Sequence, residues 1–218
     1  MALAYQKKID SQTSFALWKI EETADELFAQ LQLKEHELTY LDSLNNGKRN
    51  LHWLSTRVLL RTMLQTDEYI DCKVDEHGKP YLANFPHHIS LSHSFDYAAV
   101  MISVDKAVGI DIELMKNKIE RIARKFMSED ELDFIDPANK TEHLYMCWCA
   151  KEAIYKLQGK KQVSFLNNIR LNSFECDIDV NTTASLQIAN TPTQKYDVKY
   201  HQLGDYMIGY VAKAENEE

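Results

Sequence analysis

The chain has 218 residues, of which 44% are hydrophobic and 27% charged, a composition typical of globular proteins. That length allows roughly 70% of the unfolded surface to be buried without disulfides or metal ions. A formal net charge of −8 argues against general binding to nucleic acids or anionic membranes. No apolar run reaches the ~18 residues of a membrane span, and the N-terminus lacks a signal-peptide core. The four cysteines form no C-x-x-C pair, so we expect free thiols and a cytoplasmic protein.

The first half of the chain is expected to combine helices with short strands. A strand over residues 14–20 precedes two short helical patterns, over 21–31 and 34–44. A longer helix is expected over 48–65, where apolar residues recur near helical spacing. Four strand-like segments follow, over residues 69–74, 80–85, 88–94 and 97–104. The last two are predicted to form a hairpin that turns at Phe95 and Asp96.

The second half repeats this order of elements. A strand over 107–114 is followed by a helix over 118–126, and Ser128 with Glu131 forms a capping-box pattern that begins another helix. A long helix is expected over 141–157. The remaining strand-like segments cover residues 173–179, 184–190, 195–203 and 205–212.

These elements predict an α+β fold made of two similar halves, residues 1–104 and 105–218, related by a pseudo-twofold axis. Each half is expected to pack a helix on a small antiparallel sheet. In such an arrangement, ligands are expected in the cleft at the seam between the halves.

Two carboxylates stand out in the strand VGIDIE, residues 108–113. Asp111 and Glu113 are two positions apart, so their side chains point to the same face. Two like charges on a half-buried surface repel each other, and burying them costs several kcal/mol unless a positive partner compensates. A solvated sheet edge or a local ion pair is the simpler interpretation of this pattern.

A third carboxylate lies on the long helix, where Trp148, Glu152 and Lys156 are spaced along one stripe. By itself, the pattern is also that of an ordinary ion-pair face. If Glu152 meets Asp111 and Glu113, the three acids require a cation, and all-oxygen ligation suits Mg²⁺.

Two motifs together resemble the Sfp-type 4′-phosphopantetheinyl transferases of the holo-acyl-carrier-protein synthase superfamily. G-I-D-I-E around Asp111 is similar to the family's G-[IV]-D pattern, and W-C-A-K-E-A-I-Y-K around Glu152 is similar to its [FW]-x-x-K-E-[AS]-x-x-K pattern. Glu152 follows Asp111 by 41 residues, which resembles the family's interval. The G-K-P segment, the S-H-S strand and the F-M-S-E-D-E-L element extend the likeness over residues 78–166.

The resemblance implies a reaction and a metal ion. The 4′-phosphopantetheine group of coenzyme A passes to a serine of an apo acyl or peptidyl carrier protein, and adenosine 3′,5′-bisphosphate is released. Mg²⁺, or Mn²⁺ in its place, would be held by Asp111, Glu113 and Glu152 and completed by the substrate. Glu152 is the candidate for the base that takes the serine proton. Lys156 would neutralise or protonate the leaving phosphate.

The resemblance also implies that the first half carries most contacts to coenzyme A and the second half the metal site and carrier docking. The residues implied in coenzyme A binding are Arg57, Arg61, Lys79, Pro80, Ser92, His93, Asp111, Lys151 and Lys156. The helix carries Lys48, Arg49, Arg57 and Arg61, and the resemblance leaves open which of them contacts the 3′-phosphate of coenzyme A. Arg57 and Arg61, one turn apart, can face one phosphate, although a solvated basic face explains each residue equally well. His93 is otherwise a structural histidine, Lys79 a turn lysine, and Lys151 a solvent-exposed side chain. Phe95, where the family has small residues, is expected to reshape the nucleotide entrance.

A basic run follows the acidic pair and is a candidate dock for an acidic carrier protein; a solvated surface is the simpler interpretation. It comprises Lys116, Lys118, Arg121, Arg124 and Lys125. Rival functions are a Mg²⁺-dependent nucleotide phosphohydrolase and a catalytically silent module that binds carrier proteins or nucleotides. Shorter trimeric synthases share the chemistry, but two halves in one chain favour a monomer.

Overall fold

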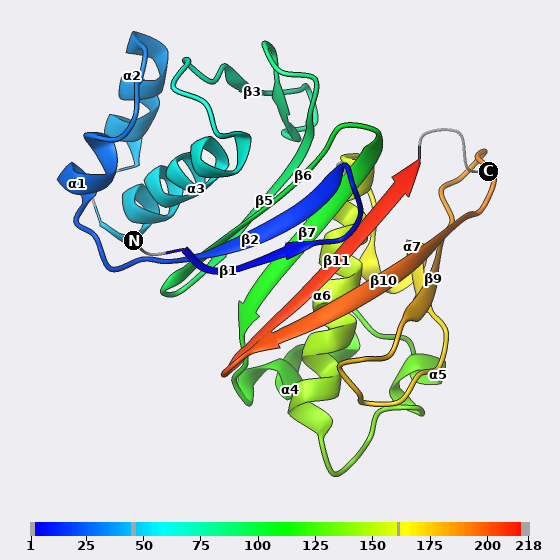
Figure 1. The fold of residues 1–218 in the computed structure, drawn as a ribbon. Coiled ribbons are helices and arrows are strands. Elements are labelled where there is room, and N and C mark those ends of the chain that lie inside the picture. Colours follow the sequence, from blue (N-terminus) through cyan, green and yellow to red (C-terminus); the bar gives the residue numbers. More distant parts are fainter. Residues whose placement is uncertain (1–2, 45–46, 161, 215–218) are drawn as a thin grey trace.

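The computed structural model describes residues 3–44, 47–160 and 162–214 and has three antiparallel sheets (Figure 1). The first sheet has the order β1-β2-β6-β5 and consists of β1 (Leu3–Lys8), β2 (Thr13–Lys19), β6 (Tyr97–Ser103) and β5 (His88–Ser94). The second has the order β7-β11-β10-β9-β8 and consists of β7 (Lys106–Leu114), β11 (Tyr206–Ala214), β10 (Gln194–Leu203), β9 (Thr182–Leu186) and β8 (Ile169–Leu171). A small ribbon pairs β3 (Cys72–Val74) with β4 (Pro80–Leu82).

The helices lie on the outer faces of the two large sheets. In the first half they are α1 (Ala24–Phe28), α2 (Glu35–Ser43) and α3 (Lys48–Leu64). In the second half they are α4 (Lys118–Ile122), the 3₁₀ turn η1 (Ala123–Lys125), α5 (Glu129–Leu132), α6 (Lys140–Gln158) and α7 (Phe165–Asn168). The two long helices, α3 and α6, cover one sheet each (Figure 1).

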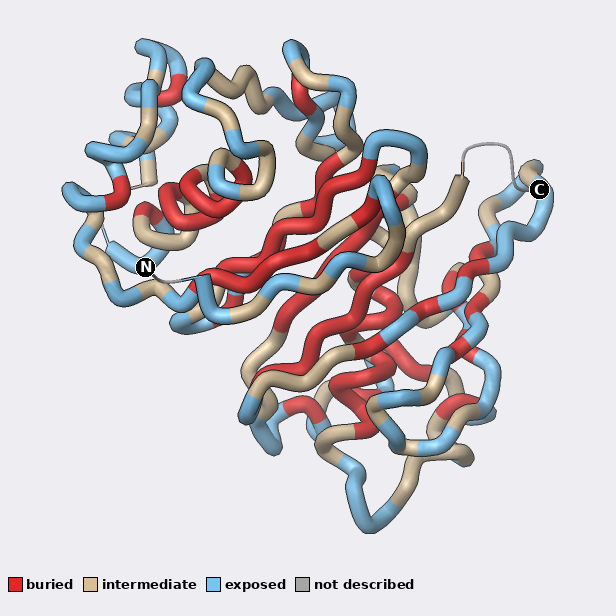
Figure 2. Tube along the Cα trace, in the orientation of Figure 1, coloured by how far each residue is buried: buried red, intermediate tan, exposed pale blue. Residues whose placement is uncertain are grey.

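The core therefore has three layers of apolar contact. One cluster packs α3 against the first sheet, and another packs α6 against the second. A third lies where the sheets meet, and strands such as β7 alternate into it with Val108, Ile110 and Ile112. Figure 2 shows the central strands of both sheets and the helix faces against them as buried. The alternation matters for function, because the residues between these three point the other way, toward α6.

Both halves share one order of elements: a strand, a long helix and a hairpin whose second strand pairs with the first strand. β2, α3 and the β5–β6 hairpin follow this order, as do β7, α6 and the β10–β11 hairpin. The α+β class predicted from the sequence is confirmed. The chain passes from one sheet to the other between Ser103 and Lys106, and the division into halves at residues 104 and 105 stays a prediction. The pseudo-twofold relation stays a prediction.

Two sequence predictions need correction. The first strand, β1, was not anticipated, and residues 173–179 do not form the expected strand. The Asp177 carboxylate accepts a hydrogen bond from the Asp179 amide and turns the chain there. The apolar alternation of this segment instead serves a loop, from which Phe174, Cys176 and Ile178 pack on the core.

All four cysteines are free thiols, as expected. No helix within the described part of the chain is long and apolar enough to cross a membrane.

Candidate active site

The seam between β5 and β7 is held together by three serines. The hydroxyl oxygens of Ser90, Ser92 and Ser94 accept hydrogen bonds from the amides of Ile110, Ile112 and Leu114, at 3.0, 3.3 and 3.1 Å. Serines at every second position of β5 face the same way, so one strand presents a row of acceptors to the other. This row joins the first sheet to the second at the strand that carries the two carboxylates.

Close approach of α6 to β7 brings the third carboxylate into place. A Cβ atom at Gly109 would lie 1.9 Å from the carbonyl oxygen of Ala153, so only glycine lets the helix cross here. Gly209 on β11 has the same role, since its Cβ would lie 2.8 Å from the carbonyl carbon of Cys149. Glu152 thereby comes to rest beside the acidic pair of β7, and the charges of Asp111 and Glu113 both raise its pKa.

Asp111 is the most buried of the three acids, with 4% of its surface exposed. Its Oδ1 accepts hydrogen bonds from Ser92 Oγ at 2.9 Å and Lys156 Nζ at 2.7 Å. Within the described residues, its Oδ2 is buried without a hydrogen-bond partner. The adjacent Cys149 thiol donates to the Met207 carbonyl at 3.6 Å, and burial first, then the nearby Asp111, raises its pKa. A buried carboxylate oxygen left this way is a ready acceptor for a cation.

Lys156 links the helix to both strands of the seam. Its Nζ donates to Ser92 Oγ at 2.7 Å, to Asp111 Oδ1 at 2.7 Å and to the Ile110 carbonyl at 3.1 Å. All three ammonium hydrogens are thus engaged in the structure, and the role of Lys156 in neutralising or protonating a leaving phosphate stays a prediction. The positive charge itself remains next to Asp111, and a quarter of the side chain is exposed.

Glu152 and Glu113 have raised pKa values. Burial and the charges of Asp111 and Glu113 together raise the pKa of Glu152 to about 7, and Lys156 opposes the shift. Burial, followed by the Asp111 charge, also raises the pKa of Glu113, while hydrogen bonds from Ser94 and Trp148 lower it. The Ser94 hydroxyl donates to Glu113 Oε2 at 3.1 Å. The site therefore holds more negative charge than Lys156 offsets.

The acids do not form a complete metal site by themselves. Within residues 3–44, 47–160 and 162–214, no group of three His, Cys, Asp or Glu side chains is arranged to hold a metal ion. The unpartnered Asp111 oxygen and the excess of negative charge nevertheless fit a hard cation. Mg²⁺ commonly binds to one or two carboxylates and takes its remaining ligands from water and substrate phosphates. The residues present fit such an ion if a substrate completes the site.

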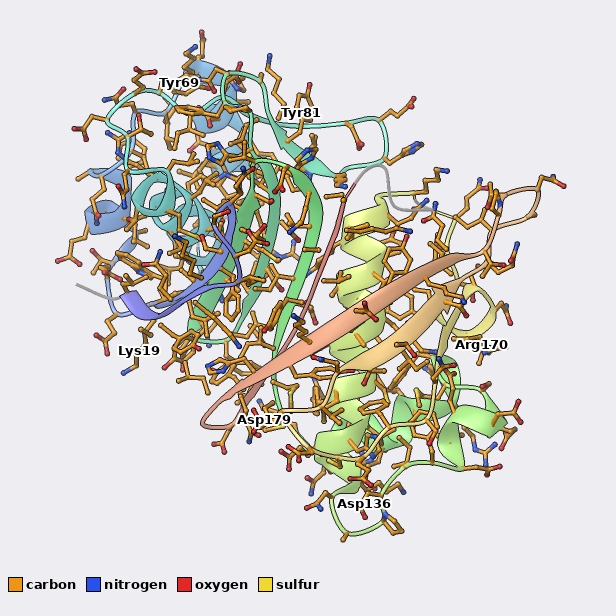
Figure 3. All side chains as sticks on the ribbon, turned by 45° about the vertical axis from the view of Figure 1, so that its right-hand side comes forward. Lys19, Tyr69, Tyr81, Asp136, Arg170 and Asp179 are labelled. Atoms are coloured by element: carbon orange, nitrogen blue, oxygen red, sulfur yellow. The ribbon has the colours of Figure 1, made fainter. Side chains whose placement is uncertain are left out.

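Lys151 is neither a phosphate contact nor a solvent-exposed side chain, and both predictions are wrong. Its side chain is 0% exposed. Its Nζ lies 2.8 Å from Glu131 Oε1 and donates to the carbonyls of Phe126, Phe165 and Ile169 at 2.8 to 3.1 Å. Burial lowers the pKa of Lys151, and the Glu131 carboxylate opposes that shift. Arg170 closes the cluster 3.7 Å from Glu131, on the half of the molecule away from β5 (Figure 3).

A groove of about 1010 Å³ opens beside this site in the first half of the chain. Its polar lining includes Arg49, Arg57 and His93, and its apolar lining includes Trp53, Pro80 and Leu91. Within the described residues, Arg57 Nε is buried without a hydrogen-bond partner, and the guanidinium carbon lies 4.6 Å from the centre of the Trp53 ring. A cation with an unused donor on an aromatic floor suits a nucleotide phosphate.

His93 connects the groove to the acids. Its ring stacks on His52 of α3, with centroids 4.2 Å apart. Desolvation, His52 and Lys156 together lower the pKa of His93 to about 4, and Asp111 opposes the shift. The imidazole is therefore neutral at pH 7, and it stands between the groove and the Asp111–Lys156 pair.

Arg61 and Lys79 do not line this groove. The Arg61 guanidinium pairs with Asp67 at 3.2 Å and donates to the Glu68 carbonyl. Arg57 and Arg61 line a second, smaller pocket together, so their contact with one phosphate stays a prediction. Tyr69, which follows this loop, lies on the α2 side of the molecule (Figure 3). Lys79 donates to the carbonyl of Leu157, so it caps the C-terminal end of α6.

Several contributors were not found from the sequence. Ser94 and Trp148 bind Glu113, and His52 supports His93. Only the serines had a detectable signal, because I-S-L-S-H-S places a hydroxyl at every second position of a predicted strand.

The comparisons with known proteins agree with this geometry. The 4′-phosphopantetheinyl transferase superfamily model matches residues 107–211, which include all three carboxylates and Lys156. A 4′-phosphopantetheinyl transferase of Bacillus subtilis is 38% identical over 92 residues, or 40% of each chain. Sfp of Bacillus subtilis strain 168, also a 4′-phosphopantetheinyl transferase, is 27% identical over 165 residues, covering 71% of this chain and 70% of that protein.

The 4′-phosphopantetheinyl transferase AcpT of Salmonella typhi is 31% identical over 159 residues, which cover 67% of this chain and 79% of that protein. Coverage is smaller for other relatives: the matched segment spans 40% of the first Bacillus subtilis protein and 43% of a putative 4′-phosphopantetheinyl transferase from Haemophilus influenzae. The extent of the Salmonella match and the family profile over the acidic site lead to one assignment. The chain belongs to the 4′-phosphopantetheinyl transferase superfamily.

Proposed function

We propose that this protein transfers 4′-phosphopantetheine from coenzyme A to a serine of an apo carrier protein and releases adenosine 3′,5′-bisphosphate. One observation carries the proposal. Asp111, Glu113 and Glu152 converge beside Lys156, at the end of a groove large enough for a nucleotide. Membership of the 4′-phosphopantetheinyl transferase superfamily supports this interpretation of the arrangement.

The groove would bind the nucleotide end of coenzyme A. The half-buried Arg57 and the exposed Arg49 both line the groove and place two positive charges there. Trp53 and Pro80 provide apolar surface for the base and ribose. Neutral His93 can donate or accept one hydrogen bond at the point where the groove meets the acids. The pyrophosphate would then lie next to Asp111.

Mg²⁺ would be held by Asp111, with Glu113 and Glu152 and the pyrophosphate completing its ligands. When bound, the ion polarises the phosphoryl oxygens and offsets their charge. Lys156 and Ser92 hold the Asp111 carboxylate in a fixed orientation through Oδ1, which leaves Oδ2 for the ion.

The transfer step forms one P–O bond and breaks another. The serine oxygen of the carrier attacks the β-phosphorus, and the bond from that phosphorus to the bridging oxygen breaks. The electron pair leaves on adenosine 3′,5′-bisphosphate. Glu152 accepts the serine proton through the carboxylate oxygen that does not bind the ion, and burial together with the Asp111 and Glu113 charges favours proton uptake there. Lys156 supplies positive charge near the developing phosphate without giving up a proton.

The carrier protein would approach along the basic run after β7. Arg124 is paired with Glu129, whereas Lys118, Arg121 and Lys125 have no ion pair in the described part of the chain. Together with Lys116, these three are therefore positive charges available to an acidic partner. We also propose a monomer, because both halves of one chain contribute to the site.

The experiment that tests this function measures the intact mass of an apo acyl carrier protein after incubation with the protein, coenzyme A and Mg²⁺. We expect a gain of one phosphopantetheine, lost with EDTA and in Glu152→Gln. Coenzyme A consumed without any gain in carrier mass would establish the phosphohydrolase instead. Bound coenzyme A with neither change would establish the silent module.

A further inference from the structure

Phe95 forms an exposed aromatic tip at the turn between β5 and β6. Its side chain is 39% exposed, and its backbone φ of 50° is in the left-handed region that bulky residues rarely adopt. The His52 ring nitrogen Nε2 lies 2.7 Å from the Phe95 carbonyl oxygen and fixes the turn. Phe95 does not line the nucleotide groove, which corrects the expectation that it reshapes the nucleotide entrance.

Two lysines, one from each half of the chain, lie over this ring. Lys116 Nζ is 3.6 Å from the ring centre and Lys48 Nζ is 5.3 Å from it. No ion pair joins either ammonium to a carboxylate within the described residues. Two uncompensated cations over one exposed ring present a surface that combines aromatic and positive character.

The position of Lys48 adds an independent sign of an anionic partner. Lys48 and Arg49 occupy the first turn of α3, which contains no acidic residue. The positive end of the helix dipole disfavours cations there. Arg49 faces the nucleotide groove, whereas Lys48 lies over Phe95. A local arrangement that opposes helix stability is expected where binding requires it.

This surface is immediately next to the acids. Ser94, which precedes Phe95, donates to Glu113 Oε2 at 3.1 Å and accepts a hydrogen bond from the Leu114 amide at 3.1 Å. Lys116 is three residues beyond Glu113. A protein whose serine reaches the pyrophosphate beside these acids must therefore place neighbouring residues over Phe95.

We propose that Phe95, Lys48 and Lys116, here called the Phe95 platform, receive the carrier protein beside its acceptor serine. The inference rests on the proposed function and specifies its partner contact. The matching surface carries an apolar side chain that covers the Phe95 ring, flanked by carboxylates that pair with the two lysines. Charge complementarity favours such a partner, because the chain as a whole has a net charge of −8 and would repel an acidic protein elsewhere.

The test combines three variants. Phe95→Asn removes the ring and keeps the turn, since asparagine tolerates positive φ. A second variant, Lys48→Glu with Lys116→Glu, reverses the charges of the two lysines. The control, Lys195→Glu, reverses the charge of an exposed lysine at the start of β10, far along that strand from the β10–β11 turn. Binding of fluorescently labelled apo acyl carrier protein is measured by anisotropy in EDTA without coenzyme A, and KM for each substrate is measured with Mg²⁺.

We expect the first two variants to weaken carrier binding at least about tenfold, as for a central aromatic contact and the two charges over it, with KM for coenzyme A unchanged. Added salt should reduce the difference between wild type and the double lysine variant. Carrier binding equal to that of the control would overturn the platform, and so would a rise in KM for coenzyme A alone. Failure of the proposed function would give a different result from failure of the platform, because wild type would then transfer no phosphopantetheine. The anisotropy comparison would still decide whether the platform binds the carrier protein.

Discussion

Replacing Lys151 with methionine separates a structural lysine from a phosphate contact. The ammonium is fully buried and binds the Glu131 carboxylate and three backbone carbonyls. Methionine keeps much of the apolar stem but leaves these oxygens without their donor. Breaking a buried pair by removing one partner costs about 3–5 kcal/mol. Glu131 retains hydrogen bonds from Ser128 and Leu171, so the cost should lie near the lower end, about 3 kcal/mol.

Urea unfolding and substrate kinetics together test this reasoning. We expect Lys151→Met to lower the free energy of unfolding by about 3 kcal/mol, and the melting temperature by roughly 10 °C for a chain of this size. KM for coenzyme A should not change at a temperature where the variant is folded. The control is Lys140→Met, which breaks an exposed pair with Glu120 and should cost less than about 1 kcal/mol. A variant of normal stability with a raised KM for coenzyme A would refute the structural role.

Three further predictions concern the groove and the acids. Arg57→Met should raise KM for coenzyme A about tenfold, whereas Arg61→Met should leave it unchanged, because Arg57 lines the groove and Arg61 does not. Equal effects of the two substitutions in steady-state kinetics would contradict this prediction. Gly109→Ala should lower kcat about 100-fold, since the new Cβ would lie 1.9 Å from the Ala153 carbonyl oxygen and displace α6; a normal kcat would show that the helix accommodates it. In EDTA, stability should fall as pH rises from about 4.5 to 7. The pKa of Glu152 is raised to about 7 in the folded state, so the folded protein binds one more proton than the unfolded chain in this window. The free energy of unfolding should therefore fall by at most about 3 kcal/mol. Urea unfolding should show this fall of the free energy of unfolding with pH in wild type and a smaller fall in Glu152→Gln. Adding Mg²⁺ at pH 8 should restore the stability lost by wild type. An equal fall in both proteins would exclude Glu152 as the source.

The features that the sequence predicted correctly depend on local patterns. The strand around Asp111 and the helix around Glu152 have clear periodicity, and their side-chain directions follow from it. The capping box of Ser128 and Glu131 is present in the structure because it involves only neighbouring backbone groups. The loop over residues 173–179 shows the limit of periodicity: alternating apolar side chains also arise where an irregular segment covers a core.

Side-chain partners that are distant in the chain were decided only by tertiary structure. Lys151 and Lys156 both lie on α6. No local sequence pattern predicts that the first is buried against backbone carbonyls and that the second contacts Asp111. Arg57 and Arg61 share one helix face, yet a loop supplies Asp67 to the second and leaves the first to the groove.

The sequence by itself determined the residue types of the site, their order and the family they point to. The tertiary structure decided that Gly109 admits α6, that the serines of β5 join the two sheets, and that Phe95 stands exposed between two lysines. The physical reason is that a charge or hydroxyl acquires its role from the groups that surround it in space. Local periodicity gives the direction of a side chain but not the partner it meets.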